Sequence, residues 1–205
     1  MYRLVSKQLK GQVVIPPSKS VAHRAIICAA LSQGSSCIYN VDYNDDIRAT
    51  INCMKELGTY IEERDDCLFI DGHTTFFRNY LNFDVGASGS TLRFLLPISL
   101  VYQSNARFTG DKRLAERDLS PYYDIFLKQE LNFLYKKDAL EILVEGYLQP
   151  GLFELPGNVS SQFISGLLFA CPLMRGDSII HLTTPLESKN YIDLTLDMLN
   201  SLVLK

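Results

Sequence analysis

Two spacings of hydrophobic residues alternate along this chain and predict its secondary structure. Short runs of β-type residues, such as 12–15, are separated by stretches in which apolar residues recur three or four positions apart. The first pattern is typical of strands and the second of helices with one buried face. The expected strands cover 3–9, 12–15, 36–41, 59–63, 67–70, 83–85, 106–109, 132–135, 140–144, 152–155 and 178–182. The expected helices cover 20–32, about 45–57, the region from the 86–93 motif to about 101, a segment capped by Ser120, a segment opened by 158–162, and 187 to about 202.

The order of these elements repeats along the chain. Strand, helix, strand, helix and hairpin follow one another twice, and a third round stops after its second helix. Ser18, Ser88 and Ser160 stand at the equivalent strand-to-helix turns, 70 and 72 residues apart. A nearly constant period of this length predicts repeated supersecondary units. We therefore expect an α/β (α+β) fold of βαβαββ units around a pseudo-threefold axis, with the third unit incomplete and the chain cut from a longer protein.

The three helix starts carry more than their serines. A helix N-terminus presents unpaired N–H groups and the positive end of the macrodipole, which together favour an anion such as phosphate. Lys19 and Arg24 lie near the first of these starts, and Arg93 and Gln162 lie near the other two. Capping requires none of these side chains, so the converging starts predict a local anion site. Serines that only cap, a lysine that is only solvated and a repeat that reflects ancestry alone are the competing interpretation.

Composition narrows the functions that are open to the chain. Its 205 residues are 47% hydrophobic and 21% charged, with a formal net charge of −3, as in a globular protein with material for a core. The acidic balance offers no general basic surface to nucleic acid, and the longest apolar run, 94–102, is too short to cross a membrane. Five scattered cysteines include no CxxC pair, so neither a zinc site nor a redox couple is indicated. Because residues 1–10 are polar and do not resemble a secretory signal, we expect a cytoplasmic protein without nucleic-acid or membrane partners.

Five motifs in fixed order make the sequence resemble the 5-enolpyruvylshikimate-3-phosphate synthase family. PPSKSVAHR at 16–24 is similar to the family's P-G-S-K-S-x-x-x-R signature, and GASGSTLR at 86–93 is similar to its G-N-x-G-T-x-x-R signature. TGDKRLAER at 109–117, SSQF at 160–163 and SKNY at 188–191 are similar to its T-G-x-x-x-x-x-E-R, S-S-Q-F and S-K-x-Y segments. Each motif is weak alone, but five in order across nearly the whole chain are specific together.

The resemblance implies a domain organisation and a reaction. Members of the family have two domains built from βαβαββ units. Residues 1–15 of this chain would be N-terminal strands that pack with the second domain. Residues 16–205 would be the first domain, which binds shikimate-3-phosphate, and the second domain would be absent. The implied reaction transfers the enolpyruvyl group of phosphoenolpyruvate to the 5-hydroxyl of shikimate-3-phosphate in the pathway to chorismate and aromatic amino acids, and it needs no metal or other cofactor.

The resemblance also implies a set of substrate-binding residues. Those expected to hold shikimate-3-phosphate are Lys19, Ser20, Arg24, Ser160, Ser161, Gln162, Ser188 and Tyr191. Those expected to meet phosphoenolpyruvate are Lys19, Gly89, Arg117 and Gln162. Hydroxyls and cations suit a phosphomonoester, and an arginine beside a lysine suits a ligand with both carboxylate and phosphate. No catalytic acid or base is assignable, because in the family these come from the second domain, so this chain alone is expected to bind without turnover.

Three positions depart from the family pattern. Pro17 replaces a glycine, His23 an asparagine, and Ala87 an asparagine or another polar residue. We expect Pro17 to stiffen its turn and Ala87 to lack one contact to phosphoenolpyruvate. His23 is expected to be a surface residue or to lie behind the residues that touch substrate. The carboxylates expected to be caps or solvated partners are Asp45, Asp46, Glu116 and Glu187.

Other functions remain open at this point. UDP-N-acetylglucosamine enolpyruvyl transferase shares the implied architecture, but segment 113–117 lacks the cysteine of that enzyme's reactive loop. A non-catalytic phosphate- or RNA-end-binding module of similar repeat topology is disfavoured by the acidic charge. A folded piece with no function of its own differs from the main hypothesis only in whether ligand binds.

Overall fold

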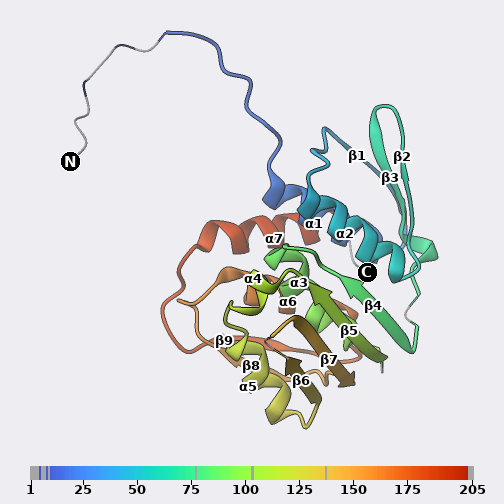
Figure 1. Ribbon diagram of the computed structural model, residues 1–205, viewed down its shortest axis with the longest axis vertical. Helices are drawn as coiled ribbons and strands as arrows, with labels where there is room; N and C mark the ends of the chain where they lie inside the picture. The colour runs from blue at the N-terminus through green and yellow to red at the C-terminus, as the bar shows by residue number, and fades with distance from the viewer. Residues whose placement is uncertain are drawn as a thin grey trace.

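Three buried helices form the centre of the molecule. The computed structural model describes residues 5, 8, 10–76, 78–102, 104–136 and 138–202, with only the backbone of Ser104 and Leu202 (Figure 1). Helices α1 (Lys19–Leu31), α3 (Gly89–Ser99) and α6 (Ser161–Ala170) are buried over most of their length. Each of these helices carries apolar and small residues on nearly every side, which is typical of a helix that packs against neighbours all round.

The remaining long helices cover this centre from outside. Helices α2 (Asp45–Glu56), α5 (Ser120–Lys128) and α7 (Lys189–Leu202) are amphipathic, and each turns its apolar stripe inward. Helix α1 lies against α2 and α7, and α6 lies against α3 and α7. Asn44 caps α2 by accepting a hydrogen bond from the N–H of Ile47, which confirms the predicted start of that helix.

Nine strands of the described chain form three small sheets on the outside. The strands are β1 (Ser35–Tyr39), β2 (Tyr60–Glu63), β3 (Cys67–Asp71), β4 (Tyr80–Asp84), β5 (Ser104–Gly110), β6 (Asn132–Lys136), β7 (Leu140–Gly146), β8 (Leu152–Leu155) and β9 (Ile179–Leu182). Their orders are β1-β3-β2, β4-β5-β7-β6 and β8-β9. Strand pairs β4-β5 and β8-β9 are parallel, and the other pairs are antiparallel.

The sheet orders confirm the repeat that the sequence predicts. The middle sheet contains a parallel pair, β4-β5, followed by a hairpin, β7-β6, whose β7 pairs with β5. The first sheet has the same order without its first strand, and the third has only the parallel pair. The repeated unit is therefore βαβαββ, complete in the second round. Leu152 and Ile179 of the third sheet and Leu196 of α7 are exposed.

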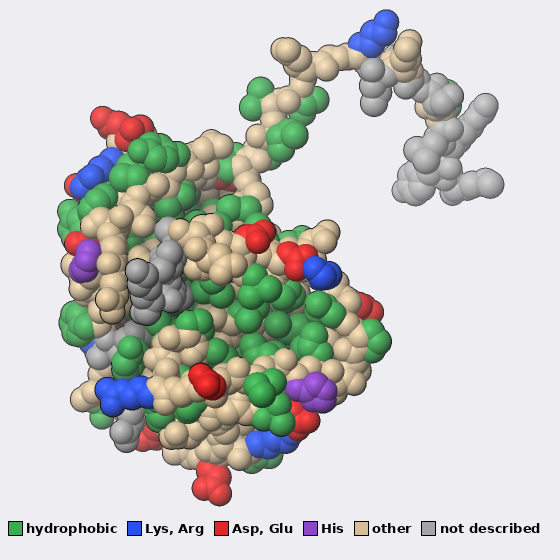
Figure 2. Space-filling model, turned by 180° about the vertical axis from the view of Figure 1, so that it is seen from behind, with side chains coloured by type: hydrophobic (Ala, Val, Ile, Leu, Met, Phe, Trp, Pro, Cys, Tyr) green, Lys and Arg blue, Asp and Glu red, His purple; other side chains and the backbone are tan. Residues whose placement is uncertain are grey.

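The predicted strand at 12–15 is wrong. Val13, Val14 and Ile15 are extended but unpaired, and Val14 is 95% exposed. Figure 2 shows this stretch of hydrophobic side chains standing off the body of the molecule. The β-type run fixes an extended shape, but a strand also needs an edge to accept its hydrogen bonds. The predicted strand at 3–9 lies largely outside the described residues.

Three smaller predictions need correction at helix ends. Residues predicted as a loop after β5 include α4 (Lys112–Ala115), a single turn that begins where Asp111 accepts from the N–H of Arg113. Ser120 is the first residue of α5 rather than its cap, and its hydroxyl donates to Asp118 instead. The helix opened at 158–162 is expected to carry an apolar stripe as far as Met174, but it stops at Ala170, and Pro172 lies in a short 3₁₀ turn, η2 (Cys171–Leu173).

Candidate anion-binding site

The three repeated helix starts meet around one cavity. Ser18 caps α1, Ser88 caps α3 and Ser160 caps α6, each accepting a hydrogen bond from a backbone N–H of its own first turn. The cap interpretation is therefore correct for all three serines. The same ends also enclose a cavity of about 430 Å³, here called the cationic cavity. It is lined by Lys19, Ser20, Arg24, Asp46, Ala87, Gly89, Ser90, Arg117, Ser160, Ser161, Gln162 and Tyr191.

Nearly all of the predicted site residues lie in this lining. Every residue expected to meet phosphoenolpyruvate lines the cavity, and so does every residue expected to hold shikimate-3-phosphate except Ser188. Ser188 is exposed just before α7, with a φ of 55°. Its carbonyl accepts from the N–H of Tyr191, which does reach the cavity. In this structure Ser188 therefore shapes the start of α7 rather than lining the cavity.

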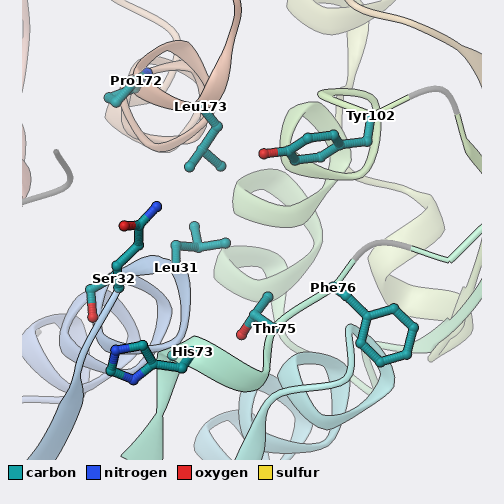
Figure 3. A pocket seen from close by; sticks show the side chains of 10 residues that line it. Leu31, Ser32, His73, Thr75, Phe76, Tyr102, Pro172 and Leu173 are labelled. Atoms are coloured by element: carbon teal, nitrogen blue, oxygen red, sulfur yellow. The ribbon is translucent and has the colours of Figure 1, made fainter.

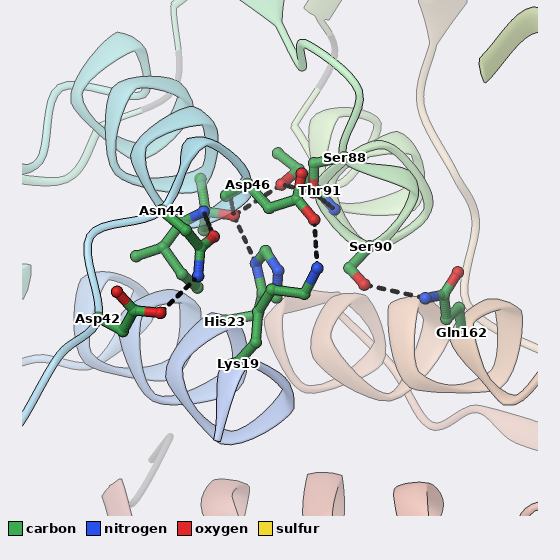
Figure 4. A network of polar contacts seen from close by, with 11 residues as sticks. Lys19, His23, Asp42, Asn44, Asp46, Ser88, Ser90, Thr91 and Gln162 are labelled. Carbon is green, nitrogen blue, oxygen red and sulfur yellow. Dashed lines mark hydrogen bonds and ion pairs between the residues drawn. The ribbon is translucent and has the colours of Figure 1, made fainter. Parts of the chain in front are cut away.

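The lining is positive although the whole chain is acidic. Among the described residues of the lining, Lys19, Arg24 and Arg117 are opposed by a single carboxylate, that of Asp46. Lys19 Nζ lies 2.6 Å from Asp46 Oδ2, and these side chains are 52% and 26% exposed (Figure 4). An anion that binds Lys19 must compete with Asp46. The sequence interpretation of Asp46 as a solvated partner is correct, but it did not identify Asp46 as part of the cavity wall.

Arg24 is held firmly at the back of the cavity. Its side chain is buried, and its Nε and Nη2 donate to the hydroxyls of Thr195 and Ser165 at 2.7 and 3.1 Å. Nη1 donates to the carbonyl of Ser20, and Nη2 also reaches the carbonyl of Tyr191. Burial lowers the pKa of Arg24 to about 10, so the guanidinium stays charged at neutral pH. Among its described contacts, one N–H of Nη1 is left to donate to a ligand. A forked contact, as an arginine at this position suggests, would need two free N–H groups.

Gln162 is clamped between α6 and α3. Its Nε2 donates to Ser90 Oγ at 2.9 Å, and its Oε1 accepts from Arg93 Nη1 at 2.7 Å. Arg93 is buried behind the cavity over the ring of Phe163. Burial, followed by the charge of Arg117, lowers the pKa of Arg93. Ser90 was missed at the sequence level, although its place directly after Gly89 in the second motif could have identified it.

Gly89 sits where two guanidinium groups approach the backbone. A Cβ at this position would lie 2.8 Å from Arg117 Nη1 and 3.1 Å from Arg93 Nη1. A glycine therefore leaves both arginine heads close to the start of α3. Two cations and a helix N-terminus at one place form an arrangement that attracts phosphate.

A buried polar network lies next to Lys19, between α1, α2 and α3 (Figure 4). His23 Nδ1 is 2.7 Å from Thr50 Oγ1, which is 2.7 Å from Thr91 Oγ1, which in turn donates to Ser88 Oγ at 2.7 Å. His23 is 1% exposed, so the expectation of a surface residue is wrong and the alternative, a place behind the cavity, is correct. Burial lowers the pKa of His23 to about 4. The ring is therefore neutral at pH 7.

The polar groups that line the cavity are of the kinds that bind an anion. Its single carboxylate, Asp46, is paired with Lys19, and the remaining polar groups are hydroxyls, an amide and cations. Among the described residues no group of three or more His, Cys, Asp or Glu side chains could hold a metal ion. Within the same part of the chain, no helix is long and apolar enough to cross a membrane.

The fold and this cavity define a class of protein, α/β proteins of repeated βαβαββ units whose helix starts converge on a cationic cavity. Solved structures share the fold: EPSP synthase from Acinetobacter baumannii matches with a TM-score of 0.75 at 24% identity, over 93% of this chain and 43% of that one. The enolpyruvyl transferase NikO from Streptomyces tendae matches with a TM-score of 0.61 at 14% identity, over 92% of this chain and 45% of the other.

Sequence comparison is more specific than the fold. The family model for EPSP synthase (3-phosphoshikimate 1-carboxyvinyltransferase) matches residues 5–205. The chain belongs to this family of transferases. It is 52% identical to the 3-phosphoshikimate 1-carboxyvinyltransferase of Clostridium perfringens, over 96% of this chain and 46% of the relative. It is 47% identical to that of Clostridioides difficile, over 95% of this chain and 47% of the relative. The chain thus spans about half the length of the curated relatives that it matches.

Proposed function

We propose that this chain supplies the shikimate-3-phosphate-binding half of an enolpyruvyl transferase. The observation that carries the proposal is the convergence of Lys19, Arg24, Ser160, Ser161, Gln162 and Tyr191 on one cavity at three helix N-termini. These residues come from α1, α6 and α7 and are far apart in the sequence. A solvated lysine and three independent caps do not require a shared cavity.

In the proposed complex the hydroxyls of Ser160 and Ser161 bind the ligand's phosphate at the positive end of α6. The remaining N–H of Arg24 and the amide of Gln162 contact the ring substituents, and Tyr191 lies against the ring. Lys19, Arg117 and the backbone at Gly89 bind phosphoenolpyruvate beside it. The 5-hydroxyl oxygen then adds to C2 of phosphoenolpyruvate as the hydroxyl gives its proton to a base and C3 takes a proton to become a methyl group. Loss of one proton from this methyl group, with cleavage of the C2–O bond to the phosphate, releases phosphate and completes the transfer.

The proton transfers need groups outside this set of residues. The single carboxylate of the lining is ion-paired with Lys19, so it is a poor general base. We therefore propose that the acid and base come from a second domain, as the family resemblance implies. The chain by itself then binds its substrate without appreciable turnover.

The test is a titration of the 205-residue chain with shikimate-3-phosphate, followed by backbone amide NMR. Saturable shifts at 160–162 and at 19–20 are expected, with UDP-N-acetylglucosamine as the comparator that leaves them unchanged. No response at millimolar shikimate-3-phosphate would reject the proposal. Release of phosphate from phosphoenolpyruvate should stay at background with this chain alone and rise when the second domain of the Clostridium perfringens relative is supplied as a separate polypeptide.

A further inference from the structure

Helices α1 and α2 face each other through two polar rungs. The outer rung is the ion pair Lys19–Asp46 at the rim of the cationic cavity, with 2.6 Å between Nζ and Oδ2. The inner rung is His23–Thr50, with 2.7 Å between Nδ1 and Oγ1. In each helix the two rungs are four residues apart, so they lie one helical turn apart on the same faces. The inner rung is buried, whereas the outer one is open to solvent.

The inner rung continues into α3. Thr50 Oγ1 contacts Thr91 Oγ1, and the hydroxyl of Thr91 donates to Ser88 Oγ, the cap of α3. Ser88, Thr50 and Thr91 are all buried. The network therefore connects α1, α2 and α3 directly below the point where Lys19, Asp46 and Gly89 line the cavity.

The donors along this network can be ordered. Since the hydroxyl of Thr91 donates to Ser88, its oxygen is free to accept from Thr50 at 2.7 Å, a shorter contact than the 3.3 Å from Thr50 Oγ1 to the carbonyl of Asp46. With either acceptor the proton of Thr50 is engaged, so the oxygen of Thr50 accepts from His23. His23 is then protonated on Nδ1, and the buried Nε2, which has no partner among the described residues, is a bare lone pair. The opposite order would put an N–H donor at Nε2 with no acceptor, and buried unpaired N–H groups are rarer than unpaired acceptors.

We infer that His23 is a positioning residue. As an Nδ1–H donor it begins a one-way chain of hydrogen bonds through Thr50 and Thr91 to Ser88, and this chain fixes where Lys19 and Gly89 stand in the cationic cavity. The inference rests on the proposed function, because the ligand of that cavity is what the positioning serves.

Burial decides which rung does the positioning. The side chains of Lys19 and Asp46 are both in contact with water, and a solvated ion pair restrains the spacing of two helices only weakly. The imidazole and the hydroxyls below have no water to replace their partners, so a change in spacing would leave buried polar groups unpaired. The inner rung therefore sets the separation of the helices, and the ion pair at the rim follows it.

The experiment compares His23→Asn with His23→Leu in the 205-residue chain. Asparagine can donate from its amide nitrogen, whereas leucine fills space without a donor. His23→Asn should bind shikimate-3-phosphate about as well as the wild type, and His23→Leu at least about fivefold more weakly. Without ligand, the backbone amide signals of 88–90 should differ from those of the wild type in His23→Leu and match them in His23→Asn. Nitrogen NMR of the wild-type ring should find the proton on Nδ1.

Controls separate this inference from a general loss of stability and from the proposed function. Thr59→Val breaks another hydroxyl pair, the partly buried Thr59–Thr75, whose oxygens are 2.7 Å apart near the other end of α1, and it should leave affinity unchanged. If His23→Leu does not fold, Thr91→Val is a second variant that interrupts the same hydrogen-bond network. If the wild type binds no ligand, the proposed function is rejected. The position of the ring proton and the amide shifts without ligand then test the hydrogen-bond network by itself. A proton on Nε2, or wild-type affinity and wild-type signals in His23→Leu, would overturn the inference.

Discussion

The two ends of the same central helices enclose two cavities of opposite character. At the N-terminal ends of α1, α3 and α6 lies the cationic cavity of about 430 Å³. At the opposite ends lies a larger one of about 670 Å³, here called the C-terminal cavity (Figure 3). It is lined by Leu31, Ser32, Gln33, Gly72, His73, Thr75, Phe76, Tyr102, Pro172 and Leu173.

The difference indicates that the direction of the helices, rather than the volume of the cavity, distinguishes the candidate anion-binding site. Among the described residues that line the C-terminal cavity there is no Lys, Arg, Asp or Glu. Carbonyls near the end of α1 are satisfied by hydroxyls of the chain itself, because Ser32 donates to Ala29 and Thr75 to Ala30. At the N-terminal ends, one serine per helix accepts one N–H, and cations stand beside the ends. Only the smaller cavity combines the positive helix poles with positive side chains.

The largest expected effect tests the C-terminal cavity as a purely structural region. In Gly72→Ala the new Cβ would lie 2.1 Å from the carbonyl oxygen of Ser32 and 2.7 Å from that of Ala29. Both are backbone atoms of α1 or its cap and cannot turn aside, so we expect a loss of about 3 kcal/mol in the free energy of unfolding. The folded molecules should keep their affinity for shikimate-3-phosphate. Urea denaturation and NMR titration measure the two quantities separately.

Gly34→Ala is the matched control for this substitution. Gly34 lies at the same end of α1, its carbonyl accepts from the N–H of Gly72, and a Cβ there would meet nothing within 4 Å. Its free energy of unfolding should change by less than about 1 kcal/mol. Loss of ligand affinity in folded Gly72→Ala would mean that the two ends are not independent.

The second prediction concerns the buried imidazole below the cationic cavity. The pKa of His23 is lowered from 6.5 to about 4, mainly by burial, with Lys19 and Arg24 adding to the effect and Asp46 opposing it. Below pH 6.5 the unfolded chain therefore takes up a proton that the folded chain refuses until about pH 4. The stability from this ring is fully present above pH 6.5 and is lost as pH falls to about 4, by about 3 kcal/mol in total.

His23→Asn removes this titration and is the comparison needed. Urea denaturation at about pH 7, 5.5 and 4 should show the wild type losing more stability than the variant at each step down. Parallel pH profiles for the two proteins would show that the ring is already charged or is not buried in solution.

The third prediction separates the charge of the cationic cavity from charge in general. Lys19→Met should weaken shikimate-3-phosphate binding at least about tenfold, equivalent to about 1.4 kcal/mol, because a cation at the helix N-terminus is lost. Lys128→Met is the matched control, since Lys128 also pairs with a carboxylate, Glu154, but at 3.4 Å and far from the cavity. Calorimetric titration of both variants decides the matter. Equal affinities would remove Lys19 from the site.

Much of the fold was accessible from the sequence, because its signals are local. The stripes of α2 and α7, the β2–β3 hairpin and the repeat of serine-bearing helix starts all follow from spacing along the chain. Elements that depend on a distant partner were not accessible. Residues 12–15 have strand composition but no sheet edge beside them in the described chain, and Ser120 has the letters of a cap while its neighbour Asp118 takes its hydroxyl.

Part of the candidate site could be predicted because its signals are local. The prediction was incomplete because its other contacts depend on residues far away in the sequence. Motif letters placed Lys19, Gly89 and Gln162 correctly in one cavity, because each sits at a helix start whose location the repeat fixes. They could not reveal that His23 is buried, since its partner Thr50 belongs to another helix 27 residues away. Nor could they reveal that Thr195 and Ser165 already accept two of the N–H groups of Arg24, because those contacts form only when α7 packs on α1 and α6 packs on α7.

The smallest expected effect returns to the comparison of the two ends through a second glycine. In Gly89→Ala the new Cβ would meet Arg117 Nη1 at 2.8 Å and Arg93 Nη1 at 3.1 Å, the far ends of flexible side chains rather than backbone. The arginine heads can move, so the free energy of unfolding should fall by less than about 1 kcal/mol. Because Arg117 is then displaced from the start of α3, phosphoenolpyruvate should bind about fivefold more weakly to the chain saturated with shikimate-3-phosphate, a change of about 1 kcal/mol. NMR titration and urea denaturation of Gly89→Ala beside Gly72→Ala measure both effects. A stability loss in Gly89→Ala as large as that in Gly72→Ala, with unchanged ligand affinity, would mean that the N-terminal end is built for packing, as the C-terminal end is.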